Sequence, residues 1–166
     1  QTPYQDQTIE TLRTLCQTCD KCELSKTRKK VVFGEKDPTA SIMIIGEGPG
    51  ADEDDQGEPF VGKAGQLLTK ILESVGLNRE KDTFITNIVK CRPPQNRNTH
   101  IEETEMCKDY LIRQIQLIKP KIIILLGSPS LKTVLEETKS ITKTRGNWYK
   151  INVDYMDQQL YIMPMF

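Results

Sequence analysis

Five cysteines have the most distinctive spacing in this 166-residue sequence. Cys16, Cys19 and Cys22 form two overlapping Cys-x2-Cys pairs, and Cys91 and Cys107 follow far downstream. A Cys-x2-Cys pair with two distant cysteines is a typical ligand pattern for zinc or for an iron–sulfur cluster. Because thiolates are soft ligands, both metals remain open on spacing alone, and disulfides or buried free thiols would also account for the cysteines.

The odd number of cysteines argues against a pure disulfide framework, which would leave one thiol unpaired. Either Cys16 and Cys19 or Cys19 and Cys22 could supply the close pair of ligands. Cys16 follows Ile9 and Leu12 at helical spacing, so we assign it to the hydrophobic face of a helix. Cys19 and Cys22 are then the expected ligands.

A glycine-rich turn, Gly46-Glu47-Gly48-Pro49-Gly50, could place a carboxylate at a binding site. It fits the loose dinucleotide pattern G-x-G-x-x-[GA], but Pro49 interrupts the turn and four acids, Asp52 to Asp55, follow at once. These acids would repel a pyrophosphate, and no Gly-Lys-[Ser/Thr] completes a P-loop. The remaining interpretations are a turn that presents Glu47 to a crevice, or a solvated loop.

Two more side chains could recognise a base. Asn87 lies at the end of a predicted strand, in Ile85-Thr86-Asn87-Ile88-Val89, and its carboxamide can donate one hydrogen bond and accept another, as the edge of a nucleobase requires. The alternative is an asparagine that caps a turn. Phe60 could stack on a base or pack in the core, and its local sequence favours the core. Lys63 adds a positive charge at the start of the next predicted helix.

The elements that must position these residues alternate along the chain. Apolar runs predict strands at 41–45, 83–89 and 121–126, with two more at 148–153 and 159–163 joined by a turn at 154–157. Helical periodicity predicts helices at 8–18, 63–75 and 99–119, and a short helix near Pro129. Thr99 and Glu102 have the spacing of a capping box, and 46–62 and 92–98 are predicted to be loops.

This alternation predicts a parallel sheet with helices on both faces. Ligands of such sheets bind beyond the carboxyl ends of the strands. Those ends carry the glycine turn, Asn87, and Gly127-Ser128, so the three segments should line one crevice.

The composition fits one intracellular domain. Lys and Arg number 23 and Asp and Glu number 23, which excludes binding to nucleic acid or membrane through bulk positive charge alone. The longest purely aliphatic run, 122–126, is too short to span a bilayer, and no signal-peptide pattern opens the chain. Basic residues nevertheless gather in two cysteine-bearing segments: Lys21, Lys26, Arg28, Lys29 and Lys30, then Lys90, Arg92 and Arg97.

Four motifs in this order resemble the family 4 (iron–sulfur) uracil-DNA glycosylases, over about residues 19–126. They are Cys19-Asp-Lys-Cys22-Glu-Leu-Ser-Lys-Thr-Arg28, Gly46-Glu-Gly-Pro-Gly50, Gln56-Gly-Glu-Pro-Phe-Val-Gly-Lys-Ala-Gly-Gln-Leu-Leu68 and Ile85-Thr-Asn-Ile-Val-Lys-Cys-Arg-Pro-Pro94. The resemblance implies a three-layer α/β/α sandwich around a mostly parallel sheet of about four strands. It also implies base-excision repair, in which the enzyme flips deoxyuridine out of DNA and hydrolyses its N-glycosidic bond.

The resemblance assigns a role to each site residue. Glu47 positions the attacking water and stabilises the sugar cation, Phe60 stacks on uracil, and Asn87 reads O4 and N3–H. Gly46, Gly48 and Pro49 hold the backbone against the base. The implied ligands of a structural 4Fe-4S cluster, with zinc as the alternative, are Cys19, Cys22, Cys91 and Cys107. The candidates for contacts with DNA phosphates are Lys63, Arg92 and Ser128.

One departure from the family concerns its second motif, a His-Pro-Ser type loop that follows a strand like 160–164. The sequence ends at Phe166, and His100, the single histidine, begins a helix, where we expect a surface residue. We therefore expect residues 1–166 to form one domain without the histidine motif and final helix. The competing hypotheses are a non-catalytic iron–sulfur module that binds DNA, and an unrelated zinc-binding α/β domain that binds a nucleotide. We expect a cytoplasmic, prokaryotic monomer whose partner is single- or double-stranded DNA that contains uracil.

Overall fold

A computed structural model describes residues 8–35, 38–127, 130, 133–134, 138–143, 148–153, 156 and 158–165. In chain order the elements are α1 (Ile9–Gln17), η1 (Glu23–Lys26), β1 (Ile42–Gly46), α2 (Ala51–Gln56), α3 (Lys63–Ser74), α4 (Arg79–Asp82), β2 (Thr83–Asn87), η2 (Pro94–Asn96), α5 (Ile101–Ile118), β3 (Ile122–Leu126), β4 (Thr138–Lys143), β5 (Tyr149–Val153) and β6 (Leu160–Met165). None of the helices in these ranges is long and apolar enough to cross a bilayer.

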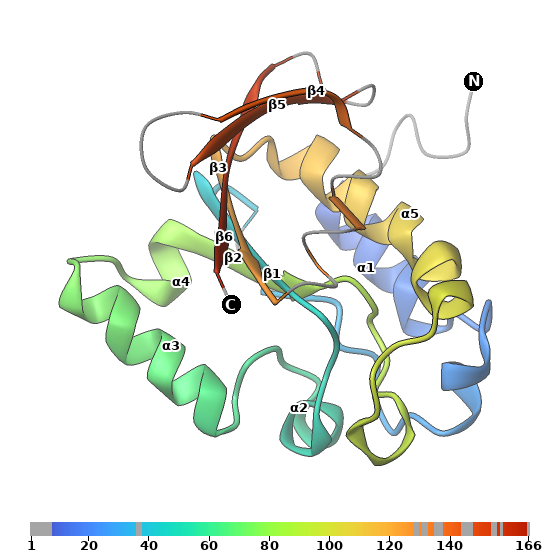
Figure 1. The fold of residues 1–166 in the computed structure, drawn as a ribbon. Coiled ribbons are helices and arrows are strands. Elements are labelled where there is room, and N and C mark those ends of the chain that lie inside the picture. Colours follow the sequence, from blue (N-terminus) through green and yellow to red (C-terminus); the bar gives the residue numbers. More distant parts are fainter. Residues whose placement is uncertain are drawn as a thin grey trace.

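The strands form one sheet in the order β2-β1-β3-β6-β5-β4. The first four are parallel, while β5 pairs antiparallel with both β6 and β4. Helices α1 and α5 cover one face and α3 and α4 the other, which confirms the predicted α/β/α sandwich (Figure 1). The predicted sheet of about four strands corresponds to the parallel part, and β4 has no counterpart among the predicted strands.

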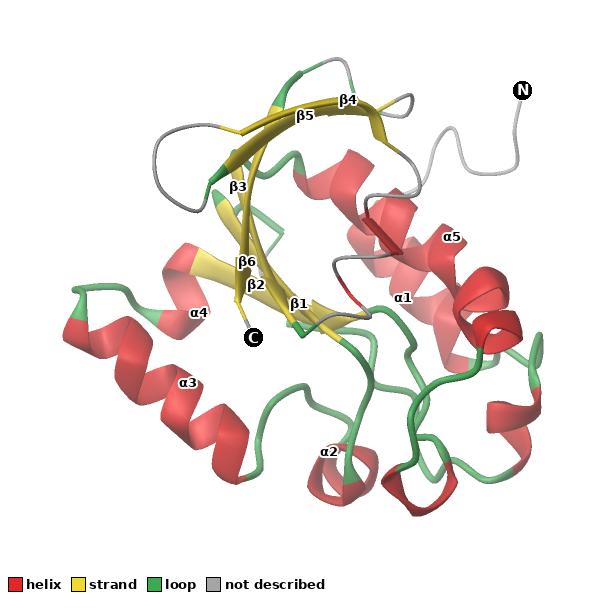
Figure 2. Ribbon diagram, viewed as in Figure 1, coloured by secondary structure: helices red, strands yellow, loops and turns green. Residues whose placement is uncertain are grey.

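The core forms because the central strands are continuous aliphatic runs, as strands covered on both faces require. The side chains of β1 and β2 are buried almost throughout, and α1 and α5 pack Leu12, Cys16, Leu111 and Ile115 against one face of the sheet. A smaller cluster around Leu72 covers the other face. Figure 2 shows this layering, with long loops beyond the carboxyl ends of β1 and β2.

Two predicted features were wrong. The segment after the glycine turn contains a short helix, α2, because its acids act as helix-terminal residues. The N-cap of α5 is His100 and not Thr99, and the His100 N–H donates to Glu103 Oε1 over 2.8 Å. The helix α3 has the predicted span, but Leu67 is 59% exposed because only part of its apolar face packs on the sheet. The predicted helix near Pro129 and the turn at 154–157 lie largely outside the described residues.

Candidate functional site

Two of the three segments predicted for one crevice meet at the carboxyl ends of β1 and β2, where Gly46 is directly opposite Asn87 in the parallel register. Of the third segment, Gly127 is not among the residues that line the cleft beside Phe60, and Ser128 lies outside the described residues. A methyl group added to Gly46 would lie 2.5 Å from Phe60 Cζ and 2.6 Å from Asn87 Oδ1. The ring and the carboxamide therefore both lie against the bare Cα of Gly46. Only glycine permits this approach, because any Cβ would occupy the same space. The structure thus brings together three residues that the sequence predicted for one site.

Asn87 presents an unsatisfied acceptor to this site. Its side chain is 2% exposed, and Oδ1 has no hydrogen-bond partner among the described residues. A buried carbonyl without a partner costs about 1–3 kcal/mol, so its retention indicates a role in binding a donor. The alternative that Asn87 only caps a turn does not account for this free acceptor.

Phe60 is half-buried and lines a cleft of about 350 Å³, which is within the usual size range of ligand sites. The other walls come from the glycine turn, from α2 and the start of α3, and from Asn87 and Asn96. Phe60 also touches the apolar cluster around Leu72. Its ring therefore belongs partly to the core, as its local sequence predicted, and partly to the cleft, where stacking on a base stays a prediction.

Glu47 lines an adjoining pocket that shares Gly48, Gly50 and Asn96 with the cleft. Its Oε2 accepts hydrogen bonds from the Thr99 backbone N–H, at 2.8 Å, and from the Thr99 hydroxyl, at 3.2 Å. These bonds explain why Thr99 does not cap α5, since its polar groups are directed to Glu47. The carboxylate is held in one orientation by a residue 52 positions away in the sequence.

All five cysteines line one pocket, together with Arg28, Lys90 and Tyr110. Cys16, Cys91 and Cys107 are buried, while Cys19 and Cys22 are half-buried at its rim. Burial raises the pKa of the Cys107 thiol to about 12, and the positive charge of Lys90 offsets part of that rise. In the described part of the chain, no three His, Cys, Asp or Glu side chains are arranged to hold a metal ion.

Lys90 gives an independent indication that this pocket holds an anion. Its side chain is 1% exposed, and its Nζ donates to three neutral oxygens: Thr86 Oγ1 at 2.7 Å, the Asn87 carbonyl at 2.5 Å and Gln114 Oε1 at 2.7 Å. Burial lowers its pKa to about 8, and the nearby cysteines raise it. A buried cation needs a compensating charge, and a thiolate-ligated cluster would supply one. The residues therefore fit such a group.

Arg28 is the second cation at this pocket. One of its terminal nitrogens, Nη1, lies 2.6 Å from the Cys19 carbonyl and 3.3 Å from Cys91 Sγ. Hydrogen bonding from Arg28 lowers the pKa of the Cys91 thiol, although burial raises it by more. Arg28 thus links the two cysteine-bearing segments, since Arg28 and Cys91 are 63 residues apart in the sequence.

Some of the basic residues that the sequence groups near the cysteines are not available to bind a phosphate. Lys90 is fully enclosed and cannot reach a phosphate, because its charge is used inside the fold. Arg97 forms an ion pair of 2.7 Å with Glu103. Among the phosphate candidates, Lys63 is exposed at the edge of the cleft and Arg92 donates to Asn96 over 2.8 Å. The remaining candidate, Ser128, lies outside the described residues.

A family model described as the uracil DNA glycosylase superfamily matches residues 33–166. This range includes the glycine turn, Phe60, Asn87 and two of the five cysteines. The chain belongs to the uracil DNA glycosylase superfamily.

Three relatives are identical to this chain at about half of the aligned residues. The Type-4 uracil-DNA glycosylase of Pyrobaculum aerophilum is 52% identical over 128 residues, which is 77% of this chain and 65% of that protein. Proteins of the same name from Archaeoglobus fulgidus and Saccharolobus solfataricus are 46% and 51% identical, over 81% of this chain in each case. The chain spans 65%, 69% and 64% of the length of these three relatives.

Sequence reasoning missed three residues that support this glycosylase-like site. Thr99 holds Glu47, Glu53 accepts hydrogen bonds from three backbone N–H groups beside the cleft, and Arg79 binds carbonyls around Phe60. In the sequence these residues differ from their neighbours only in being polar or charged, and that does not show which residue each one binds. His100 is exposed at the start of α5, as predicted.

Proposed function

We propose that this protein removes uracil from DNA by hydrolysing the N-glycosidic bond of deoxyuridine, which leaves an abasic site. The observation that carries the proposal is the buried, unpartnered Oδ1 of Asn87 beside Phe60 and Gly46. Membership of the superfamily supports the same reaction. The cleft is a pocket for a single base, so the target nucleotide must leave the helical stack to enter it.

Asn87 selects uracil through two hydrogen bonds. Its Oδ1 accepts from N3–H, and its amide group donates to O4. Cytosine has an acceptor at N3 and a donor at C4, so both positions would be mispaired. A site that is built to pair polar groups rejects an analogue that leaves them unpaired by large factors. Phe60 stacks on the face of the base, and Gly46, Gly48 and Pro49 allow the backbone to approach it.

Glu47 is the catalytic carboxylate in this proposal. Thr99 occupies its Oε2 with two donors, so the other carboxylate oxygen is available to orient the attacking water. The fixed negative charge also stabilises the sugar cation that develops as the bond to uracil breaks. Such a carboxylate is effective because it is already oriented before the charge develops.

Cys19, Cys22, Cys91 and Cys107 would hold a 4Fe-4S cluster, with zinc as the alternative. The role of such a cluster would be structural, because its four ligands come from the N-terminal segment, the loop after β2 and α5. Lys90 and Arg28 would balance its negative charge.

DNA binding completes the proposal. Lys63 and Arg92 contact phosphates on either side of the cleft, and Ser128 is a further candidate in sequence. Because these contacts are ionic, affinity for single- or double-stranded DNA should fall as salt rises. The protein acts as a monomer.

Cleavage of an oligonucleotide that contains one uracil, scored after alkali treatment, tests the proposal. The wild type should cleave at uracil and not at cytosine, and Asn87→Ala should lower the single-turnover rate by about 10²–10³. Asn87→Asp is the matched variant, because it keeps the shape and Oδ1 but loses the donor to O4. Binding of the oligonucleotide without excision by the wild type would refute the proposal and favour a DNA-binding module.

The cofactor is tested separately, by visible absorbance and metal analysis of protein purified without oxygen. A brown protein with about four irons per chain supports the cluster. A colourless protein that contains zinc would rule out the cluster and support zinc as the bound metal.

A further inference from the structure

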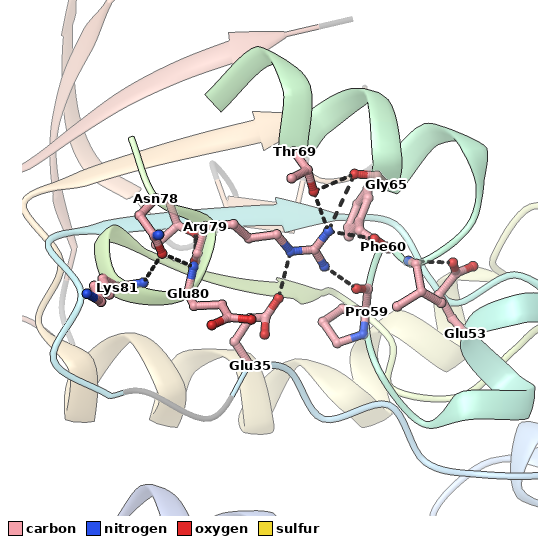
Figure 3. A network of polar contacts seen from close by, with 12 residues as sticks. Glu35, Glu53, Pro59, Phe60, Gly65, Thr69, Asn78, Arg79, Glu80 and Lys81 are labelled. Carbon is pink, nitrogen blue, oxygen red and sulfur yellow. Dashed lines mark hydrogen bonds and ion pairs between the residues drawn. The ribbon is translucent and has the colours of Figure 1, made fainter. Parts of the chain in front are cut away.

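Arg79, at the start of α4, directs its guanidinium at the loop that carries Phe60 (Figure 3). The side chain is 16% exposed, and its three nitrogens all donate. The acceptors are Glu35 Oε1 at 3.0 Å, the Pro59 carbonyl at 2.5 Å, the Phe60 carbonyl at 2.7 Å, Thr69 Oγ1 at 3.0 Å and the Gly65 carbonyl at 3.4 Å. A surface arginine rarely satisfies so many acceptors at once, so this contact is built into the fold.

The two carbonyls of Pro59 and Phe60 belong to the two peptide planes that flank the Phe60 Cα. Their relative orientation is set by the φ and ψ angles of Phe60. One planar guanidinium binds both oxygens, so it fixes these two angles together. The direction of the Cα–Cβ bond, and with it the starting point of the aromatic ring, follows from these angles.

This constraint matters because Phe60 has an unfavourable backbone conformation. Its φ is +51°, in the left-handed region that bulky residues rarely adopt. Such a conformation persists only where the surroundings determine it. A methyl group at Gly65 would lie 1.8 Å from the Phe60 carbonyl oxygen, so the first turn of α3 presses against the same peptide.

Glu53 holds the next part of the loop from the opposite side. Its Oε2 accepts from the N–H groups of Val61, at 2.9 Å, and Gly62, at 2.8 Å. These bonds fix the chain after Phe60, whereas the Arg79 bonds fix the peptides on both sides of its Cα. Figure 3 shows the two charged groups on either side of the loop. Arg79 is thus the contact that controls the conformation of Phe60 itself.

We propose that Arg79 is a positioning residue that holds Phe60 in the left-handed conformation needed for its ring to stack on the extruded base. The inference rests on the proposed function, because it assigns Phe60 to base stacking. Arg79 itself is not among the residues that line the cleft, so it would act through Phe60 and not on the base. Glu35 completes the arrangement by holding Nε, which orients the plane of the guanidinium.

The specific alternative is that Arg79 only stabilises the fold. A lysine variant separates the two roles, since lysine keeps the charge but offers a single point donor that cannot span both carbonyls. Arg13→Lys is the matched control. Arg13 also donates to two backbone carbonyls, those of Gly34 at 3.2 Å and Glu35 at 2.6 Å, and its side chain is similarly buried at 19% exposure. It binds the backbone of Glu35, whereas Arg79 binds the Glu35 carboxylate, so the control also tests whether a change at the Glu35 backbone alone reaches Phe60.

The first test uses ¹⁹F NMR of the complete protein with 4-fluorophenylalanine at its four phenylalanines, the Phe60 signal being assigned with Phe60→Leu. Arg79→Lys should shift or broaden the Phe60 signal without DNA present, and Arg13→Lys should leave it unchanged. This measurement does not depend on excision, so it stands even if the proposed function fails. An unchanged Phe60 signal in folded Arg79→Lys would overturn the inference.

The second test is a double-mutant cycle on the single-turnover rate of uracil excision. A misplacement of about 1 Å can cost up to about 10² in rate, so Arg79→Lys should lower the rate tenfold to a hundredfold. If Arg79 acts through Phe60, Arg79→Lys adds little to Phe60→Ala, and the two effects are not additive. Fully additive losses would refute the coupling.

Arg79→Gln is the second variant if the lysine protein does not fold, as judged by circular dichroism. It is also expected to perturb the Phe60 signal. If neither variant folds while Arg13→Lys does, Arg79 is a folding residue and the positioning role is wrong.

Discussion

Replacement of Gly46 by alanine should damage the base site more than the fold. The added methyl group would lie 2.5 Å from Phe60 Cζ and 2.6 Å from Asn87 Oδ1, both well inside van der Waals contact. Gly46 is the last residue of β1 and is paired with β2, so its own backbone has little freedom to retreat. The ring and the carboxamide must therefore move.

The magnitude follows from these distances. Carbon atoms pack at about 3.5–4.0 Å, so each of the two groups must shift by about 1 Å. Displacements of this size in positioned groups cost about 10² in rate, and here Phe60 and Asn87, the proposed stacking and specificity residues, move together. We expect Gly46→Ala to lower single-turnover excision of uracil by about a hundredfold or more. Overpacking should cost only about 1–3 kcal/mol of stability.

Gly76→Ala is the matched control. Gly76 has a φ of +82° and no atom within 4 Å of an added methyl group, so alanine there costs about 1–2 kcal/mol of backbone strain without reaching the cleft. Both variants should lower the melting temperature by a few degrees, at about 2–4 °C per kcal/mol for this size. Only Gly46→Ala should lose activity. A Gly46→Ala protein with the wild-type rate would refute the packing argument.

Three further predictions concern Thr99, the cysteines and the Arg97–Glu103 ion pair. Thr99→Val removes the hydroxyl donor to the Glu47 carboxylate, the proposed catalytic group, but keeps the backbone N–H. Excision should fall about threefold to tenfold, the value of one net hydrogen bond, and an unchanged rate would show that the N–H suffices. Cys91→Ser should reduce iron content and visible absorbance, while Cys16→Ala should preserve both; iron loss in Cys16→Ala would assign that thiol to the ligands. Hydrogen bonding from Arg97 lowers the pKa of Glu103 below its ordinary value of 4.5, so the ionised carboxylate stabilises the fold above that pH. The gap in unfolding free energy between wild type and Glu103→Gln should then be constant near neutral pH and close on acidification below 4.5; a gap that widens with acid would contradict this assignment.

The parallel sheet and the positions of Gly46 and Asn87 could be predicted because both follow from local pattern. An aliphatic run of five residues such as 122–126 is too short for a core helix and is typical of a strand covered on both faces. In a parallel sheet the carboxyl ends of neighbouring strands meet at one edge, so two residues that end strands become neighbours without any knowledge of packing. The direct pairing of Gly46 with Asn87 is the result.

Several supporting contacts could not be predicted, because each depends on at least one partner from another element of the fold. Lysine is normally exposed, so the sequence places Lys90 among the surface cations, yet it is enclosed by Thr86, Gln114 and the Asn87 carbonyl. Thr99 has the spacing of a helix cap, but its donors are used by Glu47. In both cases a local rule is overridden by a tertiary partner that the local sequence does not specify.

The three residues assigned to the base site are each held by a contact from another residue, through the side chain of Glu47 and through the backbones of Phe60 and Asn87. Thr99 orients the Glu47 carboxylate, Arg79 fixes the backbone of Phe60, and Lys90 binds the carbonyl of Asn87. Because these bonds exist without DNA, the site needs little reorganisation when charge develops in the transition state. Loss of such a contact should therefore lower the rate of the chemical step even at saturating DNA.

The exposed cations act at a different stage of the reaction. Lys63 is solvent-exposed at the edge of the cleft, so its contact with a phosphate would be screened by salt. Its loss should weaken DNA binding and reduce the dependence of binding on salt, while the rate at saturating DNA stays close to that of the wild type. The two roles follow from burial. Contacts shielded from solvent hold the site residues in position, and exposed cations contribute to the affinity for DNA.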